Sequence, residues 1–205
     1  MIVASFYTAK YEQEVKNLID TCHMHDLDYS INELPDKGSW LANVWQKPNY
    51  ILDTLNSTTE SVLWVDADAT IQDHLTLLPD PEADMMGVAN WQRYHGYYTY
   101  RPDLWGLGRR PGGVKPLFIR GGTLYFANND NSRKMLDLWA GEAEGCILNG
   151  TASDPAITWA VRESGINFQE LPLSYCAIFD TDADTLAKAG QTPVISHWQA
   201  SRRFR

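Results

Sequence analysis

Apolar positions near the start of the chain follow two different spacings. Residues 2–7 form a short apolar and aromatic run that ends at Thr8 and predicts a strand. The apolar residues that follow recur at helical spacing and predict an amphipathic helix: Tyr11, Val15, Leu18, Ile19 and Cys22. Residues 28–34 alternate and stop at Pro35, and Pro48 suits the first turn of a helix that buries Ile51, Leu52 and Leu55. The chain therefore opens with two strand–helix units.

The segment 62–65, Val-Leu-Trp-Val, is continuously apolar, as expected for a parallel strand covered on both faces. We place it at the centre of the sheet. Downstream, residues 85–89, 124–127 and 194–197 predict strands, and helices are expected to begin at a Ser132 cap and at Asp154-Pro155. Strands that alternate with helices predict an α/β protein, an α/β/α sandwich with a mainly parallel central sheet. Ligands of such sheets lie at the carboxyl ends of the strands.

The length and composition of the chain exclude several classes of function. A chain of 205 residues predicts a single domain over residues 1–205. Its net charge of −9 argues against a general binder of nucleic acids. Three widely spaced cysteines indicate reduced core residues rather than a disulfide framework or a metal knuckle. The first residues do not resemble a signal peptide, and no apolar run approaches the roughly 20 residues of a membrane span. We expect a cytoplasmic protein.

The most informative candidate chemistry lies directly after the central strand. Asp66 and Asp68 are two residues apart, so in extended chain their carboxylates point the same way. Two such carboxylates repel each other, and a hard divalent cation such as Mg²⁺ or Mn²⁺ relieves the repulsion. The alternative is a pair of solvated loop residues. The four apolar residues before Asp66 favour the metal site.

Several segments in this order resemble the GT-A glycosyltransferases, particularly the small metal-dependent enzymes related to the glycogenin-like family. The segments span most of the chain: Ala4-Ser5-Phe6-Tyr7, Lys47-Pro48-Asn49-Tyr50-Ile51, VLWVDADATI, Arg120-Gly121-Gly122-Thr123, Asp154-Pro155-Ala156 and Ile195-Ser196-His197-Trp198. The resemblance implies a GT-A, Rossmann-like fold and transfer of a sugar from a nucleotide-diphosphate sugar, such as a UDP-sugar, to a hydroxyl group. Similarity to the glycogenin-like family favours retention of anomeric configuration.

The resemblance also implies roles for individual residues. Asp66, Asp68 and His197 are the expected ligands of Mn²⁺ or Mg²⁺. The donor is expected over the first strands and the metal site, near Ala4, Ser5, Tyr7, Lys47, Asp66, Gly121, Gly122 and Arg202.

Some of these residues have equally simple structural explanations. Asp154 is expected to contact the transferred sugar and Arg120 to assist the departing diphosphate, but Asp-Pro is also a good helix start. The paired glycines at 121 and 122 indicate either a turn or bulge, or a close approach of backbone to the sugar. The C-terminus departs from the family, because Ser201, Arg202 and Arg203 stand where a glycogenin-like motif is expected. These three residues are candidate contacts of the diphosphate.

The segment 91–115 combines five basic residues and one acid with interleaved tyrosines and tryptophans. This mixture suits stacking on sugar rings or on bases beside phosphates, and the alternative is a loop whose aromatics pack onto the domain. The predicted acceptor is a saccharide or a modified base in DNA, since compact transferases of this kind resemble phage-encoded enzymes that glycosylate hydroxymethylated bases. Such an enzyme has to bring a buried hydroxyl into its site, and flipping the base is one way to do so.

Two other functions stay open at this stage. Asp66-Ala67-Asp68 after an apolar strand also matches the first motif of haloacid dehalogenase-like phosphatases, with Asp66 as nucleophile, although about 60 residues precede it here. A non-catalytic sugar- or nucleotide-binding module is the third alternative, with eight tryptophans and ten tyrosines as stacking surfaces. Such a module has no need of two aspartates and a histidine around one cation.

Overall fold

A computed structural model describes residues 1–90 and 118–204. Its main sheet has the strand order β2-β1-β3-β6-β5-β7. Only β6 runs antiparallel to its neighbours in this sheet, so the sheet is mainly parallel, as predicted. The strands are β1 (Ile2–Tyr7), β2 (Tyr29–Glu33), β3 (Val62–Val65), β5 (Met85–Asn90), β6 (Phe118–Phe126) and β7 (Phe168–Leu171).

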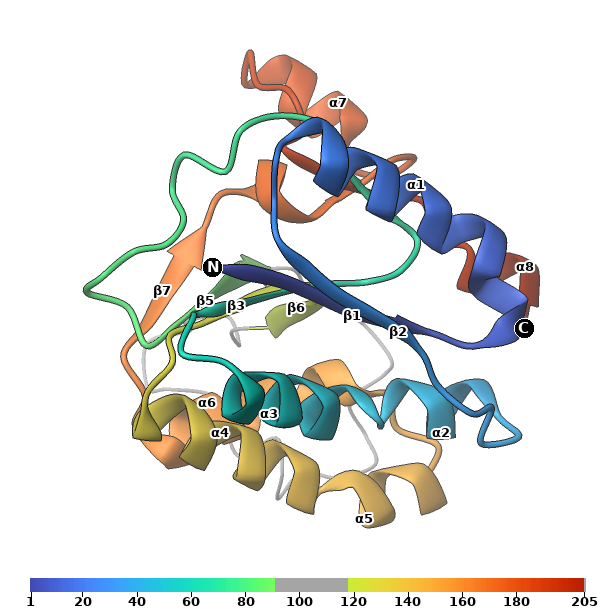
Figure 1. The fold of residues 1–205 in the computed structure, drawn as a ribbon, viewed down its shortest axis with the longest axis vertical. Coiled ribbons are helices and arrows are strands. Elements are labelled where there is room, and N and C mark those ends of the chain that lie inside the picture. The colour runs from blue at the N-terminus through green and yellow to red at the C-terminus, as the bar shows by residue number, and fades with distance from the viewer. Residues whose placement is uncertain (91–117, 205) are drawn as a thin grey trace, which may run out of the picture.

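Helices cover both faces of this sheet (Figure 1). One face carries α2 (Trp40–Val44), α3 (Lys47–Ser57), α4 (Asp130–Gly141), α5 (Ala143–Leu148) and α6 (Ser153–Ser164). The other face carries α1 (Glu12–Met24) and α7 (Ala183–Lys188), with short 3₁₀ turns at Ala9–Tyr11 and Leu173–Cys176. The α/β/α sandwich is therefore confirmed.

A second, smaller sheet has the order β4-β9-β8 and packs against α1. It consists of β4 (Ala69–Ile71), β8 (Ala177–Ile178) and β9 (Ile195–His197), and the short α8 (Ser201–Phe204) follows it. The predicted last strand therefore exists, but it lies beside β4 rather than in the main sheet. The register places Ala69 opposite His197, next to Asp68.

The central strand divides the core into two halves. Val62 and Trp64 pack on the side of α3, α4 and α6, whereas Leu63 and Val65 belong to the cluster that includes Leu18 of α1. All four residues of β3 are buried. Burial on both faces explains why the segment shows no alternation.

Three sequence-based boundaries were wrong. The cap of α4 is Asn129, whose side chain accepts from the Ser132 N–H, while the Ser132 hydroxyl donates to the Asp84 carbonyl. Helix α6 is preceded by Ala152, so Asp154 lies within the first turn and caps nothing. Strand β6 begins at Phe118, well before the predicted residue 124, because a polar and glycine-rich stretch interrupts its apolar pattern.

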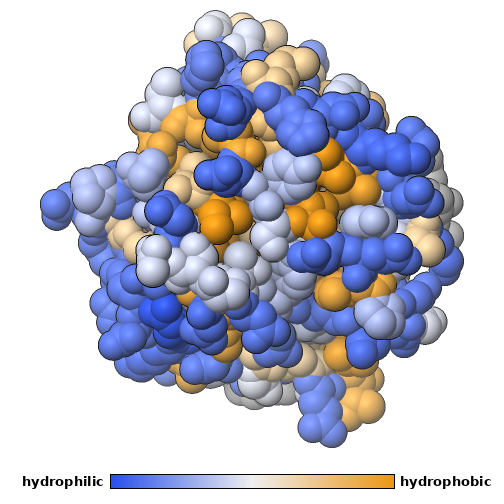
Figure 2. Space-filling model, viewed as in Figure 1, coloured by the Kyte–Doolittle hydropathy of each residue, from blue (hydrophilic) through white to orange (hydrophobic). Residues whose placement is uncertain are grey.

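The surface and the cysteines agree with the composition. On the face shown in Figure 2, hydrophilic residues predominate and hydrophobic ones form small separate areas. Cys22, Cys146 and Cys176 are buried, as predicted for core residues. No helix within residues 1–90 and 118–204 has the length and apolar character needed to span a membrane.

Candidate active site

Asp66 and Asp68 follow β3 at its carboxyl end. The chain turns there, because the Ala69 N–H donates to the Asp66 carbonyl at 3.0 Å, and then enters β4. The Asp66 N–H donates to the Gly122 carbonyl at 2.9 Å, which ties the turn to the neighbouring strand β6. The pair is therefore anchored to two strands rather than free in a solvated loop.

His197 reaches this turn through the small sheet. It is the last residue of β9 and is 2% exposed. The backbone beyond it closes around Asp68: the Trp198 N–H donates to the Asp68 carbonyl at 3.0 Å, and the Ala200 N–H donates to Asp68 Oδ2 at 2.7 Å. Gln199 adopts a left-handed backbone conformation, φ 54°, that lets the chain make this wrap.

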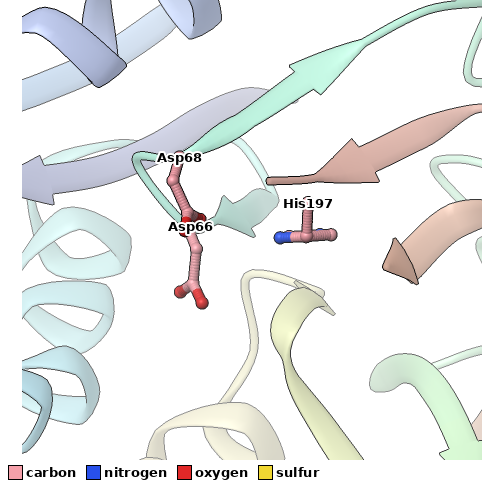
Figure 3. Close-up of side chains that lie close together, drawn as sticks. All are labelled: Asp66, Asp68 and His197. Carbon is pink, nitrogen blue, oxygen red and sulfur yellow. The ribbon is translucent and has the colours of Figure 1, made fainter. Parts of the chain in front are cut away.

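These three side chains converge (Figure 3). One potential ligand atom from each of Asp66, Asp68 and His197 lies within 4.8 Å of the other two. In Figure 3 the Asp68 carboxylate extends toward Asp66, and the imidazole faces the two carboxylates from β9. The donor set of two carboxylates and one imidazole fits a divalent cation.

Burial shifts the pKa values of Asp68 and His197. Burial, together with the negative charge of Asp66, raises the pKa of Asp68 to about 6. Burial also lowers the pKa of His197 to about 4, so its imidazole is neutral at pH 7. A neutral imidazole keeps the lone pair that a metal ligand requires. His197 Nε2 lies 2.9 Å from the Thr123 hydroxyl, which fixes the orientation of the ring.

Asp66 has two further partners, Lys47 and Trp64. Lys47 Nζ donates to Asp66 Oδ1 at 2.7 Å and to the Gly121 carbonyl at 2.9 Å. The Trp64 indole N–H donates to the same Oδ1 at 2.9 Å. Lys47 begins α3, where a positive charge is unfavourable against the helix dipole, so the ion pair with Asp66 offsets that cost.

Gly121 and Gly122 lie inside β6, at an irregularity in its pairing with β5. Both glycines therefore lie within a strand, and the close approach of backbone to the sugar stays a prediction. The space beside both glycines is filled: a Cβ on Gly121 would lie 2.6 Å from Asp154 Oδ1, and one on Gly122 would lie 2.8 Å from His197 Cε1. The glycines therefore let Asp154 and His197 approach the strand closely.

Comparison with protein-family models and with curated proteins gives no match. Solved structures do match. A glycosyltransferase involved in glycosylation of the major capsid of PBCV-1 has a TM-score of 0.63 at 15% identity, over 97% of this chain and 92% of that one. The galactosyltransferase LgtC, in complex with donor and acceptor sugar analogues, has a TM-score of 0.60 at 11% identity, over 98% and 93%.

The glycosyltransferase GlyE of Streptococcus pneumoniae TIGR4 has a TM-score of 0.56 at 14% identity, over 96% of this chain and 54% of that one. The chain has the GT-A glycosyltransferase fold. The fold prediction is confirmed. The glycogenin-like and phage assignments stay predictions.

Asp154 lies near the group formed by Asp66, Asp68 and His197, at the start of α6. Its carboxylate contacts Gly121 and lies near the charges of Lys47 and Asp66, and burial raises its pKa. The predicted contact with the transferred sugar stays a prediction, and the position of Asp154 beside the site agrees with it.

Arg120 and Arg202 pair with acidic residues. The buried Arg120 guanidinium donates to the Cys176 carbonyl at 2.8 Å and, through Nη2, to Asp182 Oδ1 at 3.2 Å. Arg202 forms an ion pair with Asp180. These partners favour a structural role for Arg120, which links β6 to the segment that precedes β9. The predicted diphosphate contacts of both arginines are untested.

The predicted donor residues of β1 lie at its carboxyl half. Ala4 and Ser5 are buried and Tyr7 is half-buried. The hydroxyls of Ser5 and of the following Thr8 are buried without a hydrogen-bond partner among the described residues. The predicted acceptor segment, 91–115, lies outside the described residues.

Sequence reasoning missed the groups that hold the carboxylates. The Trp64 indole and the Ala200 N–H both bond to the aspartates of the site. The spacing of Trp64 and Asp66 was a usable signal, since residues two apart in a strand share a face. The hydrogen bond from the Ala200 N–H to Asp68 has no such signal in the sequence, because it depends on the backbone turn at Gln199.

Proposed function

We propose that this protein is a metal-dependent glycosyltransferase that moves a sugar from a nucleotide-diphosphate sugar to a hydroxyl group. The observation that carries the proposal is the convergence of Asp66, Asp68 and His197 at the carboxyl end of β3 within a GT-A fold. Ligands of open α/β sheets bind at that edge. The three neighbours named above support the reaction class.

Asp66, Asp68 and His197 would hold the cation. The imidazole in the set favours Mn²⁺ over Mg²⁺, because Mg²⁺ is bound mostly by oxygen. When bound, the cation stabilises the negative charge that develops on the departing diphosphate. The protonation states of two of these residues at pH 7 suit metal binding. His197 is neutral, and Asp68 is ionised above about pH 6.

Other residues of the chain would orient the donor. The buried hydroxyls of Ser5 and Thr8 offer hydrogen bonds at the carboxyl end of β1, where the nucleoside is expected. Lys47 holds a positive charge against Asp66, close to the expected diphosphate. Asp154, which lies against Gly121, would accept hydrogen bonds from sugar hydroxyls.

The test is a panel of nucleotide sugars with and without Mn²⁺. Binding to the native state raises the melting temperature, so the donor should raise Tm by several degrees only when Mn²⁺ is present. The identified donor should then be hydrolysed or transferred in an EDTA-sensitive reaction. Asp66→Asn and His197→Ala should abolish both effects, whereas Asp73→Asn, at an exposed position, should keep them. Folded protein that turns over no nucleotide sugar contradicts the proposal.

Retention and the acceptor are finer parts of the same proposal. Resemblance to the glycogenin-like family supports retention, which NMR of the first-formed product decides. The composition of residues 91–115 supports an anionic acceptor such as hydroxymethylated DNA. Labelled sugar should enter a hydroxymethylated duplex, and Arg109→Ala with Arg110→Ala should prevent it. Transfer to small saccharides alone contradicts the DNA acceptor.

A further inference from the structure

Asp66 uses its two oxygens differently. The Lys47 ammonium and the Trp64 indole both donate to Oδ1, at 2.7 Å and 2.9 Å. A carboxylate held by two donors at one oxygen has a fixed plane, which directs its other oxygen. One carboxylate oxygen of Asp66 belongs to the group formed with Asp68 and His197, and Oδ1 already accepts from two donors.

We propose that Trp64 is a positioning residue, whose indole N–H holds Asp66 in the orientation that binds the divalent cation. The inference rests on the cation site of the proposed transferase, but not on any particular sugar or acceptor. Trp64 acts through Asp66 and does not itself contact a substrate.

The surroundings of Trp64 make its indole a rigid donor. The side chain is 2% exposed, and its ring packs against Phe6 and Tyr50 at centroid distances of 5.4 Å and 6.1 Å. Trp64 and Asp66 lie two residues apart along extended chain, so their side chains leave the same face. The ring cannot rotate without disturbing the core, and its N–H therefore stays aimed at Oδ1.

A neutral donor has an advantage over a second cation here. Lys47 already balances one of the two carboxylate charges of Asp66 and Asp68. Another positive group on Oδ1 would cancel the remaining charge and weaken the attraction for a divalent ion. The indole fixes the carboxylate without adding charge. Residues that orient metal ligands in this way typically change metal affinity by about 10- to 100-fold when they are replaced.

The variant Trp64→Phe removes the N–H and keeps an aromatic ring beneath the Lys47 ammonium, which lies 5.0 Å from the Trp64 ring centroid. Trp139→Phe is the matched control. Trp139 is also fully buried, but its indole N–H has no hydrogen-bond partner among the described residues. Both variants replace a core tryptophan with a smaller ring, so both lose packing contacts. Only Trp64→Phe also loses a hydrogen bond to Asp66.

Mn²⁺ binding to the full chain is measured by the electron paramagnetic resonance signal of the free ion, without any sugar nucleotide. Trp64→Phe should raise the Kd about tenfold, whereas Trp139→Phe should leave it within about twofold of the wild type. Thermal melts of both variants establish that they are folded. Equal Mn²⁺ affinity in Trp64→Phe and wild type overturns the role of Trp64.

A second readout does not depend on the size of the packing defect. In a ¹H–¹⁵N spectrum, the indole signal missing from Trp64→Phe should shift when the wild type is saturated with Mg²⁺, and the signal missing from Trp139→Phe should not. An unmoved Trp64 signal contradicts the proposal. Wild-type protein that binds Mn²⁺ but turns over no nucleotide sugar overturns the proposed function alone. Wild-type protein that binds no Mn²⁺ overturns both.

Discussion

Replacing Gly122 with alanine tests the close packing of His197 against strand β6. A Cβ at this position would lie 2.8 Å from His197 Cε1, 3.1 Å from His197 Nδ1 and 3.2 Å from Cys176 Sγ. Favourable contacts between carbon atoms lie near 3.5–4.0 Å, so the imidazole has to move by about 0.7 Å or more. It has little room, because its Nε2 is held at the Thr123 hydroxyl and its strand is paired with β4.

The expected cost follows from overpacking of a filled core, which is about 1–3 kcal/mol. For a chain of this length, that corresponds to a decrease in Tm of roughly 2–12 °C. Because the displaced group is a predicted metal ligand, the Kd for Mn²⁺ should also rise, by about 10- to 100-fold.

Thermal unfolding and Mn²⁺ titration of Gly122→Ala check both numbers. Gly141→Ala is the control, because Gly141 ends α4 and a Cβ there meets no atom within 4 Å. Alanine in a helix is favoured over glycine by about 0.5–1 kcal/mol, so this control should be as stable as the wild type or more stable, with unchanged Mn²⁺ binding. Gly122→Ala with wild-type Tm and wild-type Mn²⁺ affinity would refute the reasoning.

Two further predictions use the charged groups around the site. Because the pKa of Asp68 is raised to about 6, Mn²⁺ affinity should be constant above about pH 7 and fall by up to about tenfold per pH unit below 6, as protons compete for the carboxylate. Titrations from pH 5 to 8 measure this, and an equally steep fall in Asp68→Asn would contradict the assignment. Asp182→Ala should lower the free energy of unfolding by about 3–5 kcal/mol, because it removes the carboxylate that forms an ion pair with the buried Arg120. Burial raises the pKa of Asp182, but the bonds from Arg120 and from the Ile178 N–H outweigh it and lower the net pKa. In urea unfolding, wild-type stability should therefore fall as the pH decreases below about 4, and Asp182→Ala should lack this component.

Local patterns predicted the first half of the site. The apolar run of β3, the two aspartates after it and the helix that begins near Pro48 are all encoded within a few residues of one another. Such short-range signals predict where a strand ends, and the carboxyl end of a central strand is where α/β proteins bind ligands. Asp66 and Asp68 could be located there from the sequence alone.

The second half depends on pairing between distant segments. His197 joins Asp68 only because β9 pairs with β4 in a separate small sheet, with Ala69 opposite His197. Both strands have three residues, too few for their apolar pattern to indicate a partner. The resemblance to a family, rather than the pattern of the chain, suggested His197.

The acidic partner of each arginine could not be predicted from the sequence either. Arg120 and Arg202 are cations near a predicted diphosphate site, but the fold pairs them with Asp182 and Asp180. Many acids in a chain of net charge −9 are potential partners for any one arginine. Only the three-dimensional arrangement shows which cations are engaged by the protein itself.

The most direct measurement is the anomalous diffraction of Mn²⁺ in crystals grown with Mn²⁺ and a nucleoside diphosphate. The account predicts one manganese peak bonded to the carboxylates of Asp66 and Asp68, to a ring nitrogen of His197 and to the diphosphate. Well-ordered nucleotide in the site with no manganese between these three side chains, or manganese bound only elsewhere, would contradict the account.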